Sequence, residues 1–105
     1  MGPLMPLLED DDVNEICVNG FNDVWVKRYS QGGFMRVEGI SWPSIQSLQT
    51  ACTRITEVTG RRVNQDKPIY DGRLPGGERI NIVVPPACAK VSITIRKFPL
   101  PSLAR

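Results

Sequence analysis

Short segments of alternating polar and apolar residues, separated by turn-forming residues, are the feature that most constrains this chain. A period of two places successive side chains on opposite faces of a β-strand. The segments with this pattern are 15–18, 23–27, 34–38, 69–74, 79–84 and 91–97. Asn19-Gly20, Gly32-Gly33 and Pro75-Gly76-Gly77 supply the turn chemistry between neighbouring segments. The pattern predicts a mostly antiparallel sheet of about six strands, with the first three forming a meander.

One further segment, residues 41–59, has the periodicity of an amphipathic helix. Its apolar residues recur every three or four positions, at Ile45, Leu48, Cys52 and Ile55. Ser41 is expected as the N-cap, and Gly60 suits the C-terminal cap. Residues 4–9 predict a short N-terminal helix or turn. The expected fold is therefore α+β, a curved sheet backed by one main helix and a short N-terminal helix.

Length and composition exclude several classes of protein. The chain has 105 residues, which is enough for one domain, and no apolar run approaches the roughly 18 residues of a membrane span. It has no histidine, so Ser-His-Asp and Cys-His catalysis and histidine metal sites are excluded. Its three cysteines, Cys17, Cys52 and Cys88, are far apart, which argues against a disulfide scaffold or zinc ribbon. Cys52 is interpreted as a small core residue, and no catalytic or metal-binding residue is assigned.

Charge is distributed unevenly along the chain. Residues 1–53 carry three basic and seven acidic groups, whereas residues 54–105 carry ten basic and four acidic groups. The basic half indicates an anionic partner, such as phosphate, nucleic acid or an acidic surface, or else scattered solvated side chains. The acidic run at residues 10–12 is interpreted as a solvated loop, since EF-hand spacing is absent.

The segment 71–80 carries the chemistry of most interest. Arg73 and Arg79 flank the glycine pair of a predicted hairpin, and Arg96 falls on the polar face of the last predicted strand. Three guanidinium groups on one sheet face could bind phosphate oxygens, and the glycine amides could assist. The alternative is a hairpin whose exposed positions happen to be arginine. No Gly-rich loop ends in Lys-Ser/Thr, so a P-loop is absent from this sequence.

Six stretches of the sequence, in order, resemble the N-terminal domain of the hexameric type II/IV secretion ATPases. They are residues 2–8, 13–20, 24–28, 60–64, 77–88 and 91–97. The resemblance is strongest to the traffic ATPases of conjugation, type IV secretion and Tad pili. It covers nearly the whole chain, with residues 1–98 expected as the domain and 99–105 as the start of a linker to a P-loop ATPase domain.

The resemblance implies a PAS-like fold, a homohexameric protein and a nucleotide bound between two domains of one subunit. In such ATPases, arginines of the "G-E-R" and "I-x-I-R-K" strands reach the nucleotide phosphates. These fall at Arg79 and Arg96 here, and Arg73 and Lys97 are looser matches. ATP and Mg²⁺ are expected only in the complete ATPase, which would be cytoplasmic and peripheral at the inner membrane.

Two functions remain open at this point. The first is a regulatory, nucleotide-sensing domain that lends arginines to ATP bound by the ATPase domain and couples hydrolysis to domain motion. The second is a docking module for an inner-membrane secretion or pilus partner or nucleic acid, although direct contact with nucleic acid is not expected. Its anchors would be Trp25, Tyr29, Phe34 and Trp42, which could instead pack in the core. ATP hydrolysis by this chain alone is not expected.

Overall fold

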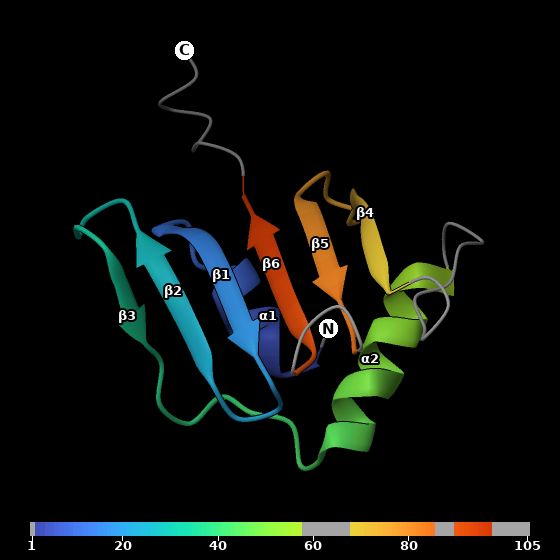
Figure 1. Ribbon diagram of the computed structural model, residues 1–105. Coiled ribbons are helices and arrows are strands. Elements are labelled where there is room, and N and C mark those ends of the chain that lie inside the picture. The colour runs from blue at the N-terminus through green and yellow to red at the C-terminus, as the bar shows by residue number, and fades with distance from the viewer. Residues whose placement is uncertain (1, 58–67, 86–89, 98–105) are drawn as a thin grey trace.

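The computed structural model describes residues 2–57, 68–85 and 90–97. Its elements are η1 (Gly2–Leu4), α1 (Met5–Leu8), β1 (Val13–Asn19), β2 (Val24–Arg28), β3 (Phe34–Arg36), α2 (Ile45–Glu57), β4 (Ile69–Arg73), β5 (Arg79–Val83) and β6 (Ser92–Arg96). The six strands form one antiparallel sheet in the order β3-β2-β1-β6-β5-β4 (Figure 1). The predicted α+β fold and the meander of the first three strands are confirmed.

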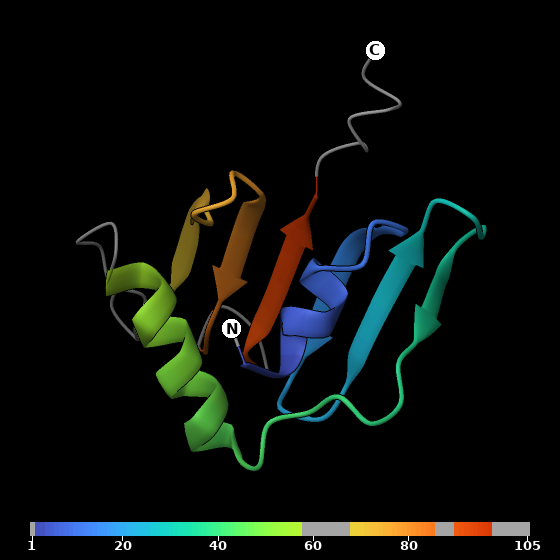
Figure 2. The same ribbon diagram turned by 180° about the vertical axis from the view of Figure 1, so that it is seen from behind.

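Both helices cover the same face of the sheet, and the opposite face is open (Figure 2). The covered face supplies most of the core, because alternate strand residues point into it. Ile93 and Ile95 on β6 are buried, as predicted, and so are Leu4 and Leu7 from the N-terminal segment. Among the described residues, none of the helices has the length and apolarity needed to cross a bilayer.

The start of α2 differs from the sequence prediction. Ser44, rather than Ser41, caps the helix, since its hydroxyl accepts the backbone N–H of Ser47 at 3.2 Å. The preceding residues form a link that brings Trp42 into the core, where its backbone N–H donates to the Phe21 carbonyl at 2.7 Å. Of the two alternatives for Trp42, packing in the core is the one that the structure shows, because only 4% of the residue is accessible.

The buried stripe of α2 is also shifted from the predicted one. Leu48, Cys52 and Thr56 are buried, whereas Ile45 is 53% exposed. Burial raises the pKa of the Cys52 thiol to about 11, which agrees with its interpretation as a core residue and not a nucleophile. The predicted end of the helix at Gly60 lies outside the described residues.

Strand β1 contains one irregularity in its pairing with β2. Val13 lies opposite Arg28, but Glu15 lies opposite Lys27, so β1 has one residue more than β2 at this point. This bulge lets Val13 and Ile16 both point into the core, although they are three residues apart. Glu15 consequently faces the open side of the sheet.

Candidate phosphate site

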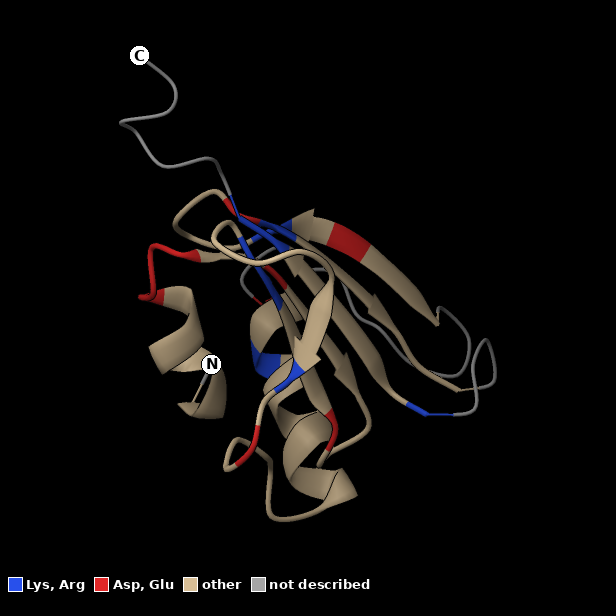
Figure 3. Ribbon diagram, turned by 90° about the vertical axis from the view of Figure 1, so that its left-hand side faces the viewer, with Lys and Arg blue, Asp and Glu red and all other residues tan. Residues whose placement is uncertain are grey.

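A row of charged residues crosses the open face at the end of the sheet where β6 stops. Strand pairing sets Arg73 opposite Arg79, Arg79 opposite Arg96, and Arg96 opposite Glu15. Residues paired in this way have Cα atoms about 4.5–5.5 Å apart and side chains on one face. Figure 3 shows the basic residues on neighbouring strands at this end. The prediction that Arg79 and Arg96 lie side by side on one face is confirmed.

Arg79 and Arg96 are largely exposed and only loosely paired. Their side chains are 60% and 68% accessible. An Arg79 Nη2 lies 3.9 Å from an Asp71 oxygen, and the Arg96 Nε lies 3.7 Å from a Glu15 oxygen. Both distances are longer than the 2.7–2.9 Å of a charge-assisted hydrogen bond. These guanidinium groups therefore keep donors for a ligand.

The two arginines line a shallow hollow of about 170 Å³. Its polar lining also includes the Asp71 carboxylate, which lies 3.9 Å from Arg79, and Asn81 and Thr94, which lie opposite one another on β5 and β6. The hollow is large enough for a phosphate group but too small for a nucleotide, since whole-ligand sites usually measure about 300–1,000 Å³. Such a surface can bind the anionic end of a ligand that is held mainly by another domain.

Arg73 is next to Arg79 in the pairing but does not line this hollow. Its Nη1 donates to the Gly77 carbonyl at 2.9 Å, within the β4–β5 turn. The Gly77 amide is also used by the turn, because it donates to the Leu74 carbonyl at 2.8 Å. The expectation that this amide is free for an anion is therefore wrong.

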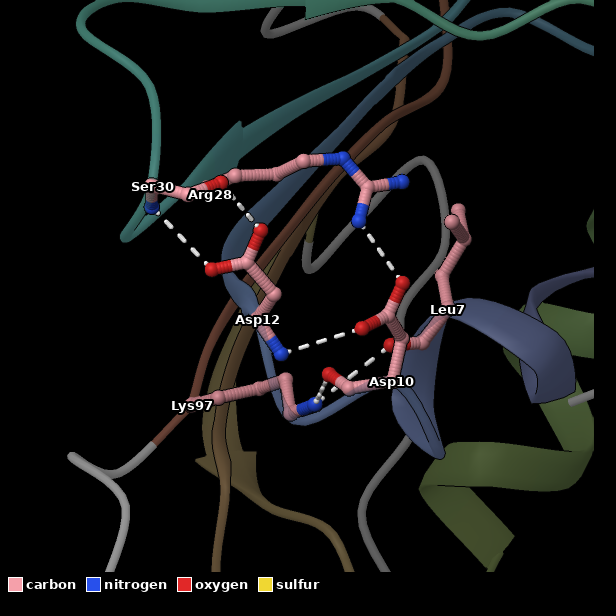
Figure 4. Close-up of polar contacts among 6 residues, drawn as sticks. All are labelled: Leu7, Asp10, Asp12, Arg28, Ser30 and Lys97. Carbon is pink, nitrogen blue, oxygen red and sulfur yellow. Dashed lines mark hydrogen bonds and ion pairs between the residues drawn. The ribbon is translucent and has the colours of Figure 1, made fainter.

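Lys97 lies away from the Arg79–Arg96 pair. Its Nζ donates to the carbonyls of Leu7 and Asp10, at 3.4 and 2.6 Å (Figure 4). Alternation along the strand explains this placement, because consecutive residues point to opposite faces. Lys97 thus ties the end of β6 to the N-terminal segment.

The acidic run makes contacts that the sequence did not predict. Asp10, Asp12, Arg28, Ser30 and Lys97 are linked by hydrogen bonds, and we call this group the polar network. Asp10 accepts a 2.7 Å hydrogen bond from Arg28, and Asp12 accepts bonds from the backbone and hydroxyl of Ser30. The bond from Arg28 is the main reason that the pKa of Asp10 is lowered. No local motif signals these contacts, because they join segments 18 residues apart.

No family model matches the chain. Individual proteins do: it is 37% identical over 105 residues to the type IV secretion system protein VirB11 of Brucella suis, and 37% identical over 111 residues to PtlH of Bordetella pertussis. These alignments cover 98% and 97% of this chain but only 27% and 31% of the relatives. The chain therefore spans less than a third of their length.

A solved structure agrees with these matches. The crystal structure of the VirB11 ATPase from the Brucella suis type IV secretion system, in complex with sulphate, superposes with a TM-score of 0.78 at 33% identity. It is matched over 93% of this chain and 29% of its own. Sequence and structure together establish that this chain is homologous to part of the VirB11 and PtlH proteins of type IV secretion systems, consistent with an N-terminal domain.

Proposed function

We propose that this chain is the N-terminal, nucleotide-sensing domain of a type IV secretion ATPase. In this proposal, Arg79 and Arg96 bind phosphate oxygens of ATP held by a separate P-loop domain. The observation that carries it is the direct pairing of these two exposed arginines on the open face of the sheet. Like charges directly opposite one another destabilise a sheet, so a bound anion would relieve their repulsion.

The chemistry of the surrounding residues supports this role. Asn81 and Thr94 add hydrogen-bonding groups beside the two arginines. Sulphate, present in the similar VirB11 structure, is a tetrahedral oxyanion like phosphate. The described residues contain no cluster of three or more His, Cys, Asp or Glu side chains for a metal ion. Mg²⁺ would therefore be held with the nucleotide by the P-loop domain.

The arginines would act by placing positive charge where negative charge lies on the phosphates. Such donors stabilise the transition state of phosphoryl transfer without taking part in covalent chemistry. Because the two arginines belong to this domain, loss of the terminal phosphate would weaken the contact that the nucleotide makes between this domain and the P-loop domain. Hydrolysis would then change how the two domains sit in a homohexameric ring at the cytoplasmic side of the inner membrane. Arg73 and Lys97 are looser candidates by resemblance alone, because each already donates to backbone carbonyls of this domain.

The test is the ATPase rate of a full-length protein containing this domain. Arg79→Ala or Arg96→Ala should lower the rate about 10- to 1,000-fold, the range for loss of one or more electrostatic donors. Lys27→Ala is the matched control, since Lys27 belongs to the same charged row but does not line the hollow. Normal hydrolysis by both arginine variants, with the hexamer and circular dichroism unchanged, would reject the proposal.

Docking of a membrane-side partner is a second candidate function, supported by exposed aromatic residues near the β3 edge. Trp25 and Phe34 are 37% and 43% exposed and lie diagonally opposite on the open face, and Tyr29 is 36% exposed. Replacing Trp25 and Phe34 together with alanine should weaken binding of an inner-membrane platform protein by about tenfold or more, as for interface anchors. An unchanged affinity in a pull-down titration would exclude this edge.

A further inference from the structure

A second and larger cavity lies on the helix-covered side of the sheet. It measures about 630 Å³ and is lined by η1, by α2, by the link that precedes α2, and by the β4–β5 turn. We refer to it as the interhelix groove, because α1 and α2 stand on either side of this part of the sheet in Figure 2. It is separate from the hollow lined by Arg79 and Arg96, since the two lie on opposite faces and have no described lining residue in common.

The groove has an apolar floor. Trp42 and Leu74, which are 4% and 9% exposed, are among its lining residues. Ala51 and Ile55 line it from one side of α2, beside the stripe that packs in the core. An apolar, partly enclosed surface of this kind suits aliphatic side chains of a ligand.

Among the described residues that line the groove, Arg54 is a cation and none is a carboxylate. Arg54 comes from α2, whereas Arg73 borders the groove at the end of β4 but directs its side chain to the open face, in line with its pairing with Arg79. Within the described parts of the chain, Arg54 is exposed and has no salt bridge. The charge of the groove therefore complements a carboxylate.

We propose that the interhelix groove binds an acidic amphipathic peptide segment of a partner protein. Aliphatic side chains of that segment would cover Trp42 and Leu74, and a Glu or Asp would pair with Arg54. Arginine forms bidentate hydrogen bonds with carboxylates, so the pairing would fix the orientation of the peptide. Hydroxyl groups of Ser47 and Thr50 on the same wall can bond to peptide backbone. A free phosphate would leave the apolar floor uncovered.

The first experiment titrates the isotope-labelled chain with short, blocked peptides made of Leu, Ala and Glu. Matched peptides carry Gln in place of Glu. We expect saturable NMR shifts at the Trp42 indole N–H and at the amides of Ala51 and Arg54, weaker at high salt. The Gln peptides should bind about tenfold more weakly. Equal binding of both peptide sets, or no saturable shift at these residues, would overturn the proposal.

Variants locate the binding site. Arg54→Glu should weaken binding of the Glu peptide at least about tenfold, and Thr50→Trp should obstruct the groove from an exposed position on the helix. Lys27→Glu reverses a charge on the open face and should leave peptide affinity unchanged. Peptide-induced shifts at Arg79 and Arg96 instead of the groove would contradict the proposal. The same would follow if the groove residues shifted with protein concentration alone, since a second copy of the chain would then be the occupant.

Discussion

Two basic clusters lie at the same end of the sheet but differ in how their charges are compensated. In the polar network, Arg28 donates to the Asp10 carboxylate at 2.7 Å, and Lys97 donates to the Asp10 backbone carbonyl at 2.6 Å. The second cluster is the paired arginines of β4, β5 and β6, which we call the arginine row. In it, Arg79 approaches the Asp71 carboxylate only to 3.9 Å, and Arg96 approaches the Glu15 carboxylate only to 3.7 Å. The comparison teaches that contact distance, rather than the number of basic residues, separates cations that hold the fold from cations available to a ligand.

The largest expected effect on stability in this comparison is at Lys97. Lys97→Met keeps the aliphatic stem but removes the ammonium that bridges the Leu7 and Asp10 carbonyls. We expect the free energy of unfolding to fall by about 1–3 kcal/mol, the range for hydrogen bonds from a charged donor. Urea denaturation measures it. A Lys97→Arg control should recover part of the loss, and an unchanged midpoint for Lys97→Met would remove the distinction between the clusters.

A smaller effect is expected at Asp10, and it depends on pH. The Arg28 hydrogen bond lowers the pKa of Asp10 in the folded chain, so its contribution to stability is present above the unfolded pKa of about 3.9. That contribution is lost as the pH falls through the lower folded value. Asp10→Asn should cost about 1 kcal/mol or less at neutral pH, because the pair is partly exposed.

The matching measurement compares unfolding midpoints of wild type and Asp10→Asn at neutral pH and in acid. The difference between the two proteins should shrink as the acid protonates Asp10 in the wild type. A difference that stays constant with pH would mean that the Asp10–Arg28 pair does not contribute as an ion pair.

The smallest effect on stability is expected in the arginine row. Arg96→Ala should change the free energy of unfolding by no more than about 0.5 kcal/mol, as is usual for an exposed residue. Glu15→Gln removes a carboxylate that competes for Arg96. The Glu15→Gln variant should therefore bind pyrophosphate about two- to fivefold more tightly than the wild type, which calorimetry can measure. A large loss of stability for Arg96→Ala would place this arginine with the structural cations.

Local patterns predicted most of the secondary structure, and they placed the two arginines correctly. Alternation is a property of each strand by itself, so the outward direction of Arg79 and Arg96 follows from their neighbours Ile80 and Ile95. Their exact pairing also depends on β5 and β6 being adjacent in this particular register, which alternation alone does not fix. The resemblance to secretion ATPases added the proposed role of the pair, which spacing alone left open.

What the sequence did not reveal depends on contacts between distant segments. Glu15 reaches Arg96 because β1 and β6 lie side by side, and no local motif encodes that adjacency. The sequence left the burial of Trp42 open, and the backbone hydrogen bond from Trp42 to Phe21 joins segments that are distant in the sequence, which no local pattern encodes. Lys97 was grouped with the phosphate ligands by motif, although its Nζ bonds to the N-terminal segment.

The bulge in β1 has a consequence for how sequences of different length can share this fold. Because β1 has one extra residue at the bulge, removing Asn14 would restore strict alternation through Val13, Glu15 and Ile16 without exchanging the two faces. Val13 would still point inward and Glu15 outward. The Lys97 backbone N–H would lose the Asn14 carbonyl, to which it donates at 2.9 Å. Relatives one residue shorter at this position can therefore keep the arginine row intact.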